Sequence, residues 1–171
     1  MKDMKSCCFT GHRPAKLPWG YDEENAACAK LKDELSLWIT KLIEFGVNKF
    51  YTGMAMGTDI WAAKIVLAMK KKYPDKNINL IAAIPYEGQT NNWSEDWKKR
   101  YADILNQADE KVLLQKQYTR GCLHARNRYM VDNSSFIIAV FNGEEGGTKY
   151  TIDYAKKQGL RIKILDPREY A

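Results

Sequence analysis

The stretch SFIIAVF, residues 135–141, is the most continuously apolar run in the chain and the strongest indication of its fold. A strand that is apolar at every position, rather than at alternate positions, is typical of a parallel sheet covered on both faces. The turn NGEEGGT follows at residues 142–148, and a helical pattern continues to residue 158. Because parallel strands need a crossover connection, this strand, turn and helix predict part of a βαβ arrangement.

The same alternation of strand and helix patterns extends through the rest of the chain. Further strands are predicted at residues 5–10, 47–52, 79–84, 111–114 and 161–165, and further helices at residues 24–45, 58–72, 94–106 and 121–132. This order predicts a Rossmann-like, doubly wound α/β fold, with a mainly parallel sheet flanked by helices in a single domain over residues 1–171. Ligands of such sheets bind beyond the carboxyl ends of the strands, near the switch in strand order.

The longest predicted helix, residues 24–45, has an apolar stripe in steps of three and four residues. Its members are Ala27, Leu31, Leu35, Trp38, Leu42 and Phe45. Gly46 follows the stripe and is predicted to cap the helix C-terminus.

The composition is typical of a globular protein, with 45% hydrophobic and 28% charged residues in 171. No apolar stretch approaches the roughly 18 residues that cross a bilayer, so we expect no membrane span. The first five residues are polar and lack the apolar segment of a secretory signal, so we expect a cytoplasmic protein. The four cysteines form no C-x-x-C pair and are predicted to be reduced core residues.

The net charge of +6 comes from 27 Lys and Arg against 21 Asp and Glu. It favours an anionic partner, from a nucleotide to a nucleic acid. With two histidines and no cysteine pair at ligand spacing, we expect no metal site.

The first glycine-rich turn, TGMAMGTD at residues 52–59, joins a predicted strand to a predicted helix. It lacks both the G-x-G-x-x-G pattern and the lysine of a P-loop. Its glycines and the free N–H groups of the helix start could bind a phosphate, so we take Gly53, Met54, Gly57, Thr58 and Asp59 as candidate ligand-binding residues. Alternatively, Thr58 or Asp59 caps the helix, and the Asp59 carboxylate would repel a phosphate placed on it.

The second glycine-rich turn, at residues 142–148, follows the most apolar strand. Gly146, Gly147 and the Thr148 hydroxyl could hold phosphate oxygens at the next helix start. The alternative is that the glycines only permit positive φ angles and Thr148 caps the helix. Glu144 and Glu145 add negative charge nearby.

Three candidates follow the first strand, and one follows the third. Gly11, His12 and Arg13 are predicted to face the same crevice, where Arg13 could form paired hydrogen bonds with phosphate or carboxylate. Alternatively, His12 and Arg13 hold the long loop up to residue 24 in place. Tyr86 is a candidate to stack on a base, although an aromatic residue in such a loop can simply close the core.

Arg126 and Arg128 lie on the helix at residues 121–132 and are two positions apart, about 200° around it. They cannot both face one site. Arg128 has Asp132 one turn along as an ion-pair partner, whereas Arg126 has apolar neighbours and is the better anion ligand. We interpret His124 as a surface or hydrogen-bonding histidine.

Five motifs together resemble the SLOG superfamily, which groups the Smf/DprA proteins with the LOG-type nucleotide enzymes, and most closely its YpsA-like branch. They are FTGHRP (9–14), TGMAMGTDIWAA (52–63), IPYEGQTNNW (84–93), LHARNRYM (123–130) and SSFIIAVFNGEEGGT (134–148). The resemblance implies a Rossmann-like fold and a nucleotide-derived ligand, such as ADP-ribose or an NAD-like molecule, at the carboxyl edge of the sheet. It also implies a possible homo-oligomer.

The LOG enzymes are phosphoribohydrolases that release a base from a nucleoside monophosphate, and the resemblance to them is incomplete. Arg126 matches their arginine, but Ala125 and Asn127 replace the accompanying acid and lysine. Residues 149–151 are Lys, Tyr and Thr where these enzymes place a glutamate, and Asp153 lies too far round the helix to replace it. We therefore carry over ligand binding and leave catalysis open, and we see no site for a pyridoxal phosphate lysine.

Three hypotheses about function follow. The first is a cytosolic protein that binds or senses a nucleotide-derived ligand, and the second is a nucleoside monophosphate hydrolase. The third is binding of single-stranded nucleic acid, by analogy with the DprA relatives. We consider a nucleic-acid partner unlikely, because the basic clusters at residues 70–72 and 98–100 are explained by solvated helix faces and the helix dipole.

Overall fold

Six strands within residues 4–171, which the computed structural model describes, form one parallel sheet. Their order across the sheet is β4-β3-β2-β1-β5-β6. Their bounds are β1 Ser6–Gly11, β2 Lys49–Thr52, β3 Asn79–Ile84, β4 Glu110–Leu113, β5 Phe136–Val140 and β6 Arg161–Leu165. Residues 1–3, part of the polar start used to predict localisation, lie outside the described residues.

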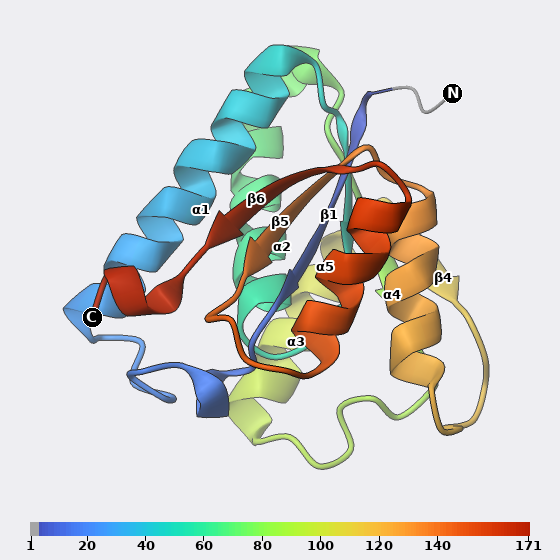
Figure 1. Ribbon diagram of the computed structural model, residues 1–171. Helices are drawn as coiled ribbons and strands as arrows, with labels where there is room; N and C mark the ends of the chain where they lie inside the picture. The colour runs from blue at the N-terminus through green and yellow to red at the C-terminus, as the bar shows by residue number, and fades with distance from the viewer. Residues whose placement is uncertain (1–3) are drawn as a thin grey trace.

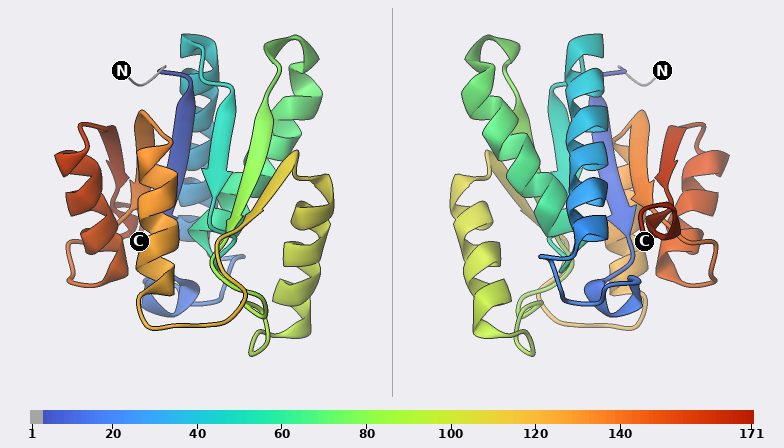
Figure 2. Two further views of the ribbon diagram at one scale, coloured as in Figure 1. Left: turned by 90° about the vertical axis from the view of Figure 1, so that its right-hand side faces the viewer. Right: turned by 90° about the vertical axis from the view of Figure 1, so that its left-hand side faces the viewer.

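Helices cover both faces of the sheet, as Figures 1 and 2 show. One layer contains α1, α2 and α3, and the other contains α4 and α5. Their bounds are α1 Ala26–Phe45, α2 Thr58–Lys72, α3 Glu95–Gln107, α4 Cys122–Asp132 and α5 Gly147–Lys157. Every predicted element is present, with ends shifted by at most two residues, and the predicted Rossmann-like, doubly wound fold is confirmed.

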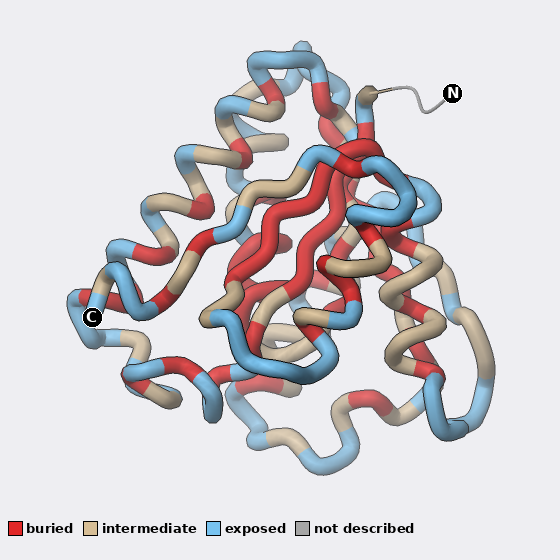
Figure 3. The backbone as a smooth tube through the Cα atoms, in the orientation of Figure 1, coloured by how far each residue is buried: buried red, intermediate tan, exposed pale blue. Residues whose placement is uncertain are grey.

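The sheet separates two apolar cores, because neighbouring residues of a strand point to opposite faces. Cys7 belongs to the larger core under α1, α2 and α3, whereas Cys8 belongs to the smaller core under α4 and α5. All four cysteines are buried, and none of them forms a disulfide within residues 4–171. Figure 3 shows the central strands buried along their length, with the exposed residues on the outer faces of the helices.

Helix α1 begins and ends at recognisable caps. The Asn25 side chain accepts a hydrogen bond from the Ala27 N–H at 2.8 Å, and Gly46 has a φ of 117° as the predicted C-terminal cap. The buried stripe differs from the predicted one toward the C-terminus. It continues from Leu35 to Ile39 and Ile43, while Phe45 is 61% exposed, because successive steps of four follow this helix face against the sheet.

Strand β1 lies at the switch point of the sheet, where it pairs with both β2 and β5. Gly11 and Val140 are paired at the carboxyl end of this junction. Because the strand order switches at this junction, a ligand crevice is expected beyond the carboxyl ends of β1 and β5. In residues 4–171, no helix is both long and apolar enough to span a membrane.

The Glu23 carboxylate joins the three helices of the larger layer. Oε1 accepts hydrogen bonds from Lys32 Nζ at 2.8 Å and from Trp61 Nε1 at 2.9 Å, and Oε2 accepts one from Arg100 Nη1 at 2.7 Å. Burial raises the pKa of Glu23, but the hydrogen bonds from Lys32 and Arg100 outweigh it and hold the pKa below its usual value. The charged carboxylate therefore stabilises the packing of α1, α2 and α3.

Replacing Glu23 by Ala is expected to lower the free energy of unfolding at pH 7 by about 2 kcal/mol, since hydrogen bonds to charged groups are lost. Because the folded pKa is lowered, this stabilisation is present above the unfolded pKa of about 4.5 and is lost as the pH falls through the folded value. Urea unfolding at pH 7 and pH 4 measures both effects. The exposed neighbour Glu24, replaced by Ala, is the control, and equal losses in the two variants would contradict the prediction.

Candidate functional site

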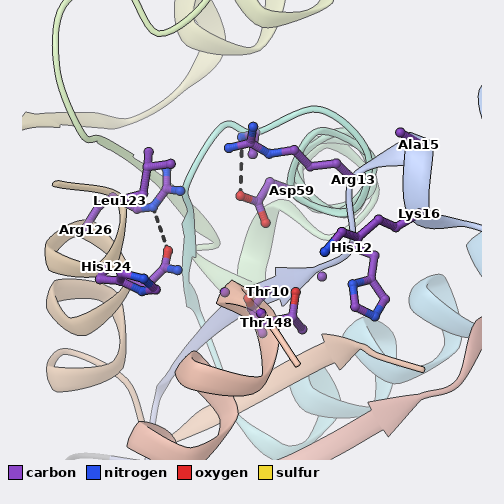
Figure 4. Close-up of a pocket in the computed structure, with 15 residues that line it drawn as sticks. Thr10, His12, Arg13, Ala15, Lys16, Asp59, Leu123, His124, Arg126 and Thr148 are labelled. Carbon is purple, nitrogen blue, oxygen red and sulfur yellow. Dashed lines mark hydrogen bonds between the residues drawn. The ribbon is translucent and has the colours of Figure 1, made fainter. Parts of the chain in front are cut away.

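A cavity of about 420 Å³ lies beyond the carboxyl ends of β1 and β5. Its walls come from the segment after β1, the first turn of α2, the first turns of α4 and the start of α5 (Figure 4). The predicted site residues that line it are Gly11, His12, Arg13, Asp59, Arg126, Gly146, Gly147 and Thr148. Four segments that are distant in sequence therefore meet at the predicted edge of the sheet.

The Arg126 side chain is 4% exposed and is held in place by the protein. Nη1 donates to the Gly53 carbonyl oxygen, and Nε donates to Asn127 Oδ1 at 2.8 Å. A Cβ on Gly53 would lie 2.7 Å from the guanidinium carbon, so only glycine admits the arginine here. Burial lowers the pKa of Arg126 and the Asp59 charge raises it, while an arginine stays protonated in proteins.

Asp59 brings a carboxylate into the same cavity from the first turn of α2. Its Oδ2 accepts a hydrogen bond from the Ala55 N–H at 3.3 Å. Burial raises the pKa of Asp59, and Arg126, the Ala55 N–H and Arg13 oppose this rise. Within residues 4–171 neither guanidinium forms an ion pair with Asp59, so the charges compensate one another through space.

Helices α2 and α5 both have glycine at the N-cap position, Gly57 and Gly146, and no side chain caps either N-terminus within the described part of the chain. The Asp59 carboxylate bonds back to the Ala55 N–H instead of the helix start. At α5, Gly146 and Gly147 face the cavity, and Lys16 Nζ lies 3.5 Å from the position of a Cβ on Gly146. The first amides of α5 therefore face a cavity with a positive charge above them, which favours an anion.

Gly11 and His12 fix the junction between β1 and its neighbours. A Cβ on Gly11 would lie 2.2 Å from Thr58 Oγ1, so glycine allows α2 to start against β1. His12 Nε2 lies 2.7 Å from Asn142 Oδ1 and 3.1 Å from the Asn142 backbone nitrogen. Burial lowers the pKa of His12, and the hydrogen bond with Asn142 opposes this. The imidazole thus joins the loops after β1 and β5.

Five predicted site residues do not line the cavity: Gly53, Met54, Gly57, Thr58 and Tyr86. Met54 is fully buried in the larger core. At Gly57 a Cβ would lie 3.1 Å from Pro14 Cδ, so this glycine allows a loop contact. The Tyr86 ring packs edge-on against the Tyr118 ring, with the two ring centroids 5.3 Å apart.

Lys16 and His124 line the cavity but were not predicted site residues. Lys16 belongs to the short 3₁₀ turn Pro14–Lys16 and forms no ion pair within residues 4–171. In the sequence, Lys16 is a second cation in the loop that carries Arg13, and this could have indicated its place in the cavity. The His124 ring lies 4.1 Å from the Tyr150 ring, and its buried Nδ1 has no hydrogen-bond partner among the described residues. No spacing rule indicated this position.

The other charged residues of α4 and α5 form surface contacts. Arg128 Nη1 donates to the Tyr150 hydroxyl at 2.8 Å, and Asp132 accepts the Tyr154 hydroxyl at 2.6 Å, so the predicted Arg128–Asp132 pair does not form. Asp153 pairs with Lys149 at 2.7 Å, outside the cavity. Among the residues that line the cavity, the carboxylate comes from α2 rather than from α5.

The parallel sheet and its switch-point crevice define a Rossmann-like, doubly wound α/β protein. DNA processing protein A of Streptococcus pneumoniae matches 94% of this chain with a TM-score of 0.61 and 16% identity, and this chain covers 50% of that protein. DNA processing protein A of Helicobacter pylori, described for its single-stranded DNA binding mode, matches 94% with a TM-score of 0.62 and 17% identity. This chain covers 65% of the Helicobacter protein, and both matches show the shared fold.

The chain belongs to the YspA SLOG family, whose YpsA model matches residues 7–169. The SPbeta prophage-derived protein YoqJ of Bacillus subtilis (strain 168) is 36% identical over 150 residues, covering 80% of this chain and 86% of YoqJ. A UPF0398 protein of Bacillus cereus (strain ATCC 14579) is 29% identical over 160 residues, covering 91% of this chain and 85% of that protein. The resemblance inferred from the five motifs is confirmed.

Proposed function

We propose that this protein binds or senses a nucleotide-derived ligand, such as ADP-ribose, an NAD-like molecule or a nucleoside phosphate, in the cavity at the β1–β5 junction. The observation that carries the proposal is that Arg13, Lys16 and Arg126 line one cavity together with the start of α5, which no side chain caps in the described part of the chain. A volume of about 420 Å³ is within the range of small-molecule sites.

The three cationic side chains of the cavity differ in whether the protein already holds them in place. Arg126 is buried and held by Gly53 and Asn127, so it supplies a fixed positive charge. Arg13 and Lys16 have exposed side chains with no hydrogen bond or ion pair within residues 4–171. They can therefore move onto a phosphate, with Arg13 forming paired hydrogen bonds and Lys16 acting as a point charge.

Thermal unfolding with a panel of AMP, ADP-ribose, NAD and cyclic nucleotides tests the proposal. A ligand at 100 times its dissociation constant stabilises the folded state by about 2.7 kcal/mol, which raises the melting temperature by several degrees. Inorganic phosphate at the same concentration separates nucleotide binding from simple anion binding. If no nucleotide in the panel shifts the melting temperature, the proposal fails.

Replacing Lys16 by Ala is expected to weaken the tightest ligand of the panel about 10-fold, because one charge-assisted hydrogen bond is lost. Isothermal titration calorimetry measures the change. Lys157 is an exposed lysine in the last turn of α5, and its replacement by Ala makes the same change in net charge away from the cavity. Equal weakening in the two variants would point to the overall charge rather than to a contact.

Single-stranded nucleic acid is a second candidate ligand, because the fold is shared with the Helicobacter DNA processing protein A over 94% of this chain. The similarity in fold to the two DNA processing proteins A weighs against our expectation that this protein has no nucleic-acid partner. In the basic helix clusters, Lys70 pairs with Asp109 and Arg100 with Glu23. A bound strand would use the cations of the cavity, and gel shifts of single-stranded oligonucleotides at low and high salt test it.

A further inference from the structure

Asp59 is the acidic residue among those that line the cavity. Its carboxylate points into the cavity in Figure 4, and the residue is only 7% exposed. Oδ2 accepts the Ala55 N–H at 3.3 Å, whereas Oδ1 has no hydrogen-bond partner in residues 4–171. Because Oδ1 has no donor among the described residues and Asp59 lines the cavity, this oxygen is an acceptor available to a ligand group.

The charge of Asp59 limits which ligand group can lie beside it. A phosphate there would be repelled, because like charges interact strongly away from bulk water. Phosphate groups fit better at the start of α5, where Lys16 Nζ is near Gly146. The ligand group next to Asp59 is then an uncharged hydrogen-bond donor.

A sugar hydroxyl meets this requirement. An ionised carboxylate accepts hydrogen bonds at both oxygens, and two adjacent hydroxyls present two donors at a matching spacing. In dinucleotide-binding Rossmann domains an acidic residue further along the chain bonds the ribose 2′-hydroxyl. Here the carboxylate instead comes from the first turn of α2, directly after the strand β2.

We propose that Asp59 holds the ribose hydroxyls of the ligand, so that the cavity selects ribonucleotides over their deoxy analogues. This inference rests on the nucleotide-binding function proposed above. Burial raises the pKa of the Asp59 carboxyl, and hydroxyl donors favour its charged form, so ligand binding lowers that pKa again. A purely structural Asp59, stabilising the start of α2, would produce no preference between sugars.

Calorimetric titration of the full chain with ADP, 2′-deoxy-ADP and 3′-deoxy-ADP tests the inference. ADP is expected to bind the unmodified protein about 10-fold more tightly than either deoxy analogue. In Asp59→Asn the preference falls below about threefold, while 2′-deoxy-ADP keeps its affinity or gains some, because a negative charge is removed. Asp153→Asn, which removes a paired surface carboxylate of α5, keeps the preference for ADP.

The outcomes separate this inference from the proposed function. If the unmodified protein binds ADP and both deoxy analogues equally, the sugar is not recognised and the inference is overturned, while nucleotide binding stands. If none of the three nucleotides binds, the inference is overturned, while the melting-temperature panel still decides the proposed function. The comparison among analogues uses the unmodified protein, so it tests sugar recognition even where Asp59→Asn does not fold. A single-stranded deoxyoligonucleotide that displaces ADP equally from the unmodified protein and from Asp59→Asn also overturns the inference.

Discussion

Gly11→Ala is expected to lower the free energy of unfolding by about 3 kcal/mol or more, because the new methyl group has no space. The added Cβ would lie 2.2 Å from Thr58 Oγ1 and 2.7 Å from Thr58 Cβ, both far inside contact distance. Neither the Gly11 backbone nor the Thr58 side chain can easily move to relieve this contact. Gly11 is paired with Val140 in the sheet, and Thr58 is 1% exposed at the start of α2.

Chemical denaturation of Gly11→Ala and a matched control measures this effect. Gly147 has no atom within 4 Å of an added Cβ, so Gly147→Ala is expected to change stability by less than about 1 kcal/mol. The double variant Gly11→Ala, Thr58→Gly removes the colliding side chain and is expected to recover part of the loss. Similar stability of Gly11→Ala and Gly147→Ala would show that β1 and α2 can separate at little cost.

The fold could be predicted from the sequence because its signals are local. The spacing of apolar residues in each strand and helix reflects which of its faces is buried. Strand β5, at residues 136–140, is buried on both faces and is therefore apolar at nearly every position. The place of the site followed from the same topology, since the carboxyl ends of parallel strands share one edge. Arg13, Asp59 and Arg126 line the cavity at that edge.

The direction of individual side chains could not be predicted in the same way. Gly53 was a candidate to bind a phosphate, but the group next to it is the Arg126 guanidinium, which is distant in the chain. Tyr86 was a candidate to stack on a base, and its ring lies edge-on against Tyr118 from another loop. His124 lies in the cavity wall because α4 packs against α5, a tertiary contact that leaves no periodic signal.

The buried charges of Arg126 and Asp59 depend on each other, although they form no direct ion pair. Each has lost water on folding, and each raises or lowers the pKa of the other in the direction that keeps both charged. An uncompensated buried charge is costly, whereas removing both partners is often tolerated. The charges of Arg126 and Asp59 can therefore be removed singly or together by mutation to measure how strongly they interact.

Arg126→Met is expected to destabilise the protein by about 3 kcal/mol at pH 7, because the Asp59 carboxylate loses its main compensating charge. Asp59→Asn in the same background is expected to recover part of this loss, and a double-mutant cycle by chemical denaturation gives the coupling. Arg128→Met, which removes a surface hydrogen bond to Tyr150, is the control and should cost less than about 1 kcal/mol.

The pH dependence of Arg126→Met identifies the group responsible. Burial already raises the pKa of Asp59, and removing Arg126 raises it further. A carboxyl group with a raised folded pKa destabilises the fold above that pKa, and the penalty disappears as the pH falls toward the unfolded value of about 3.8. The difference in stability between Arg126→Met and the unmodified protein should therefore shrink in acid. If it stays constant with pH and the double variant is simply additive, the loss comes from the packing and hydrogen bonds of Arg126, and the two charges are independent.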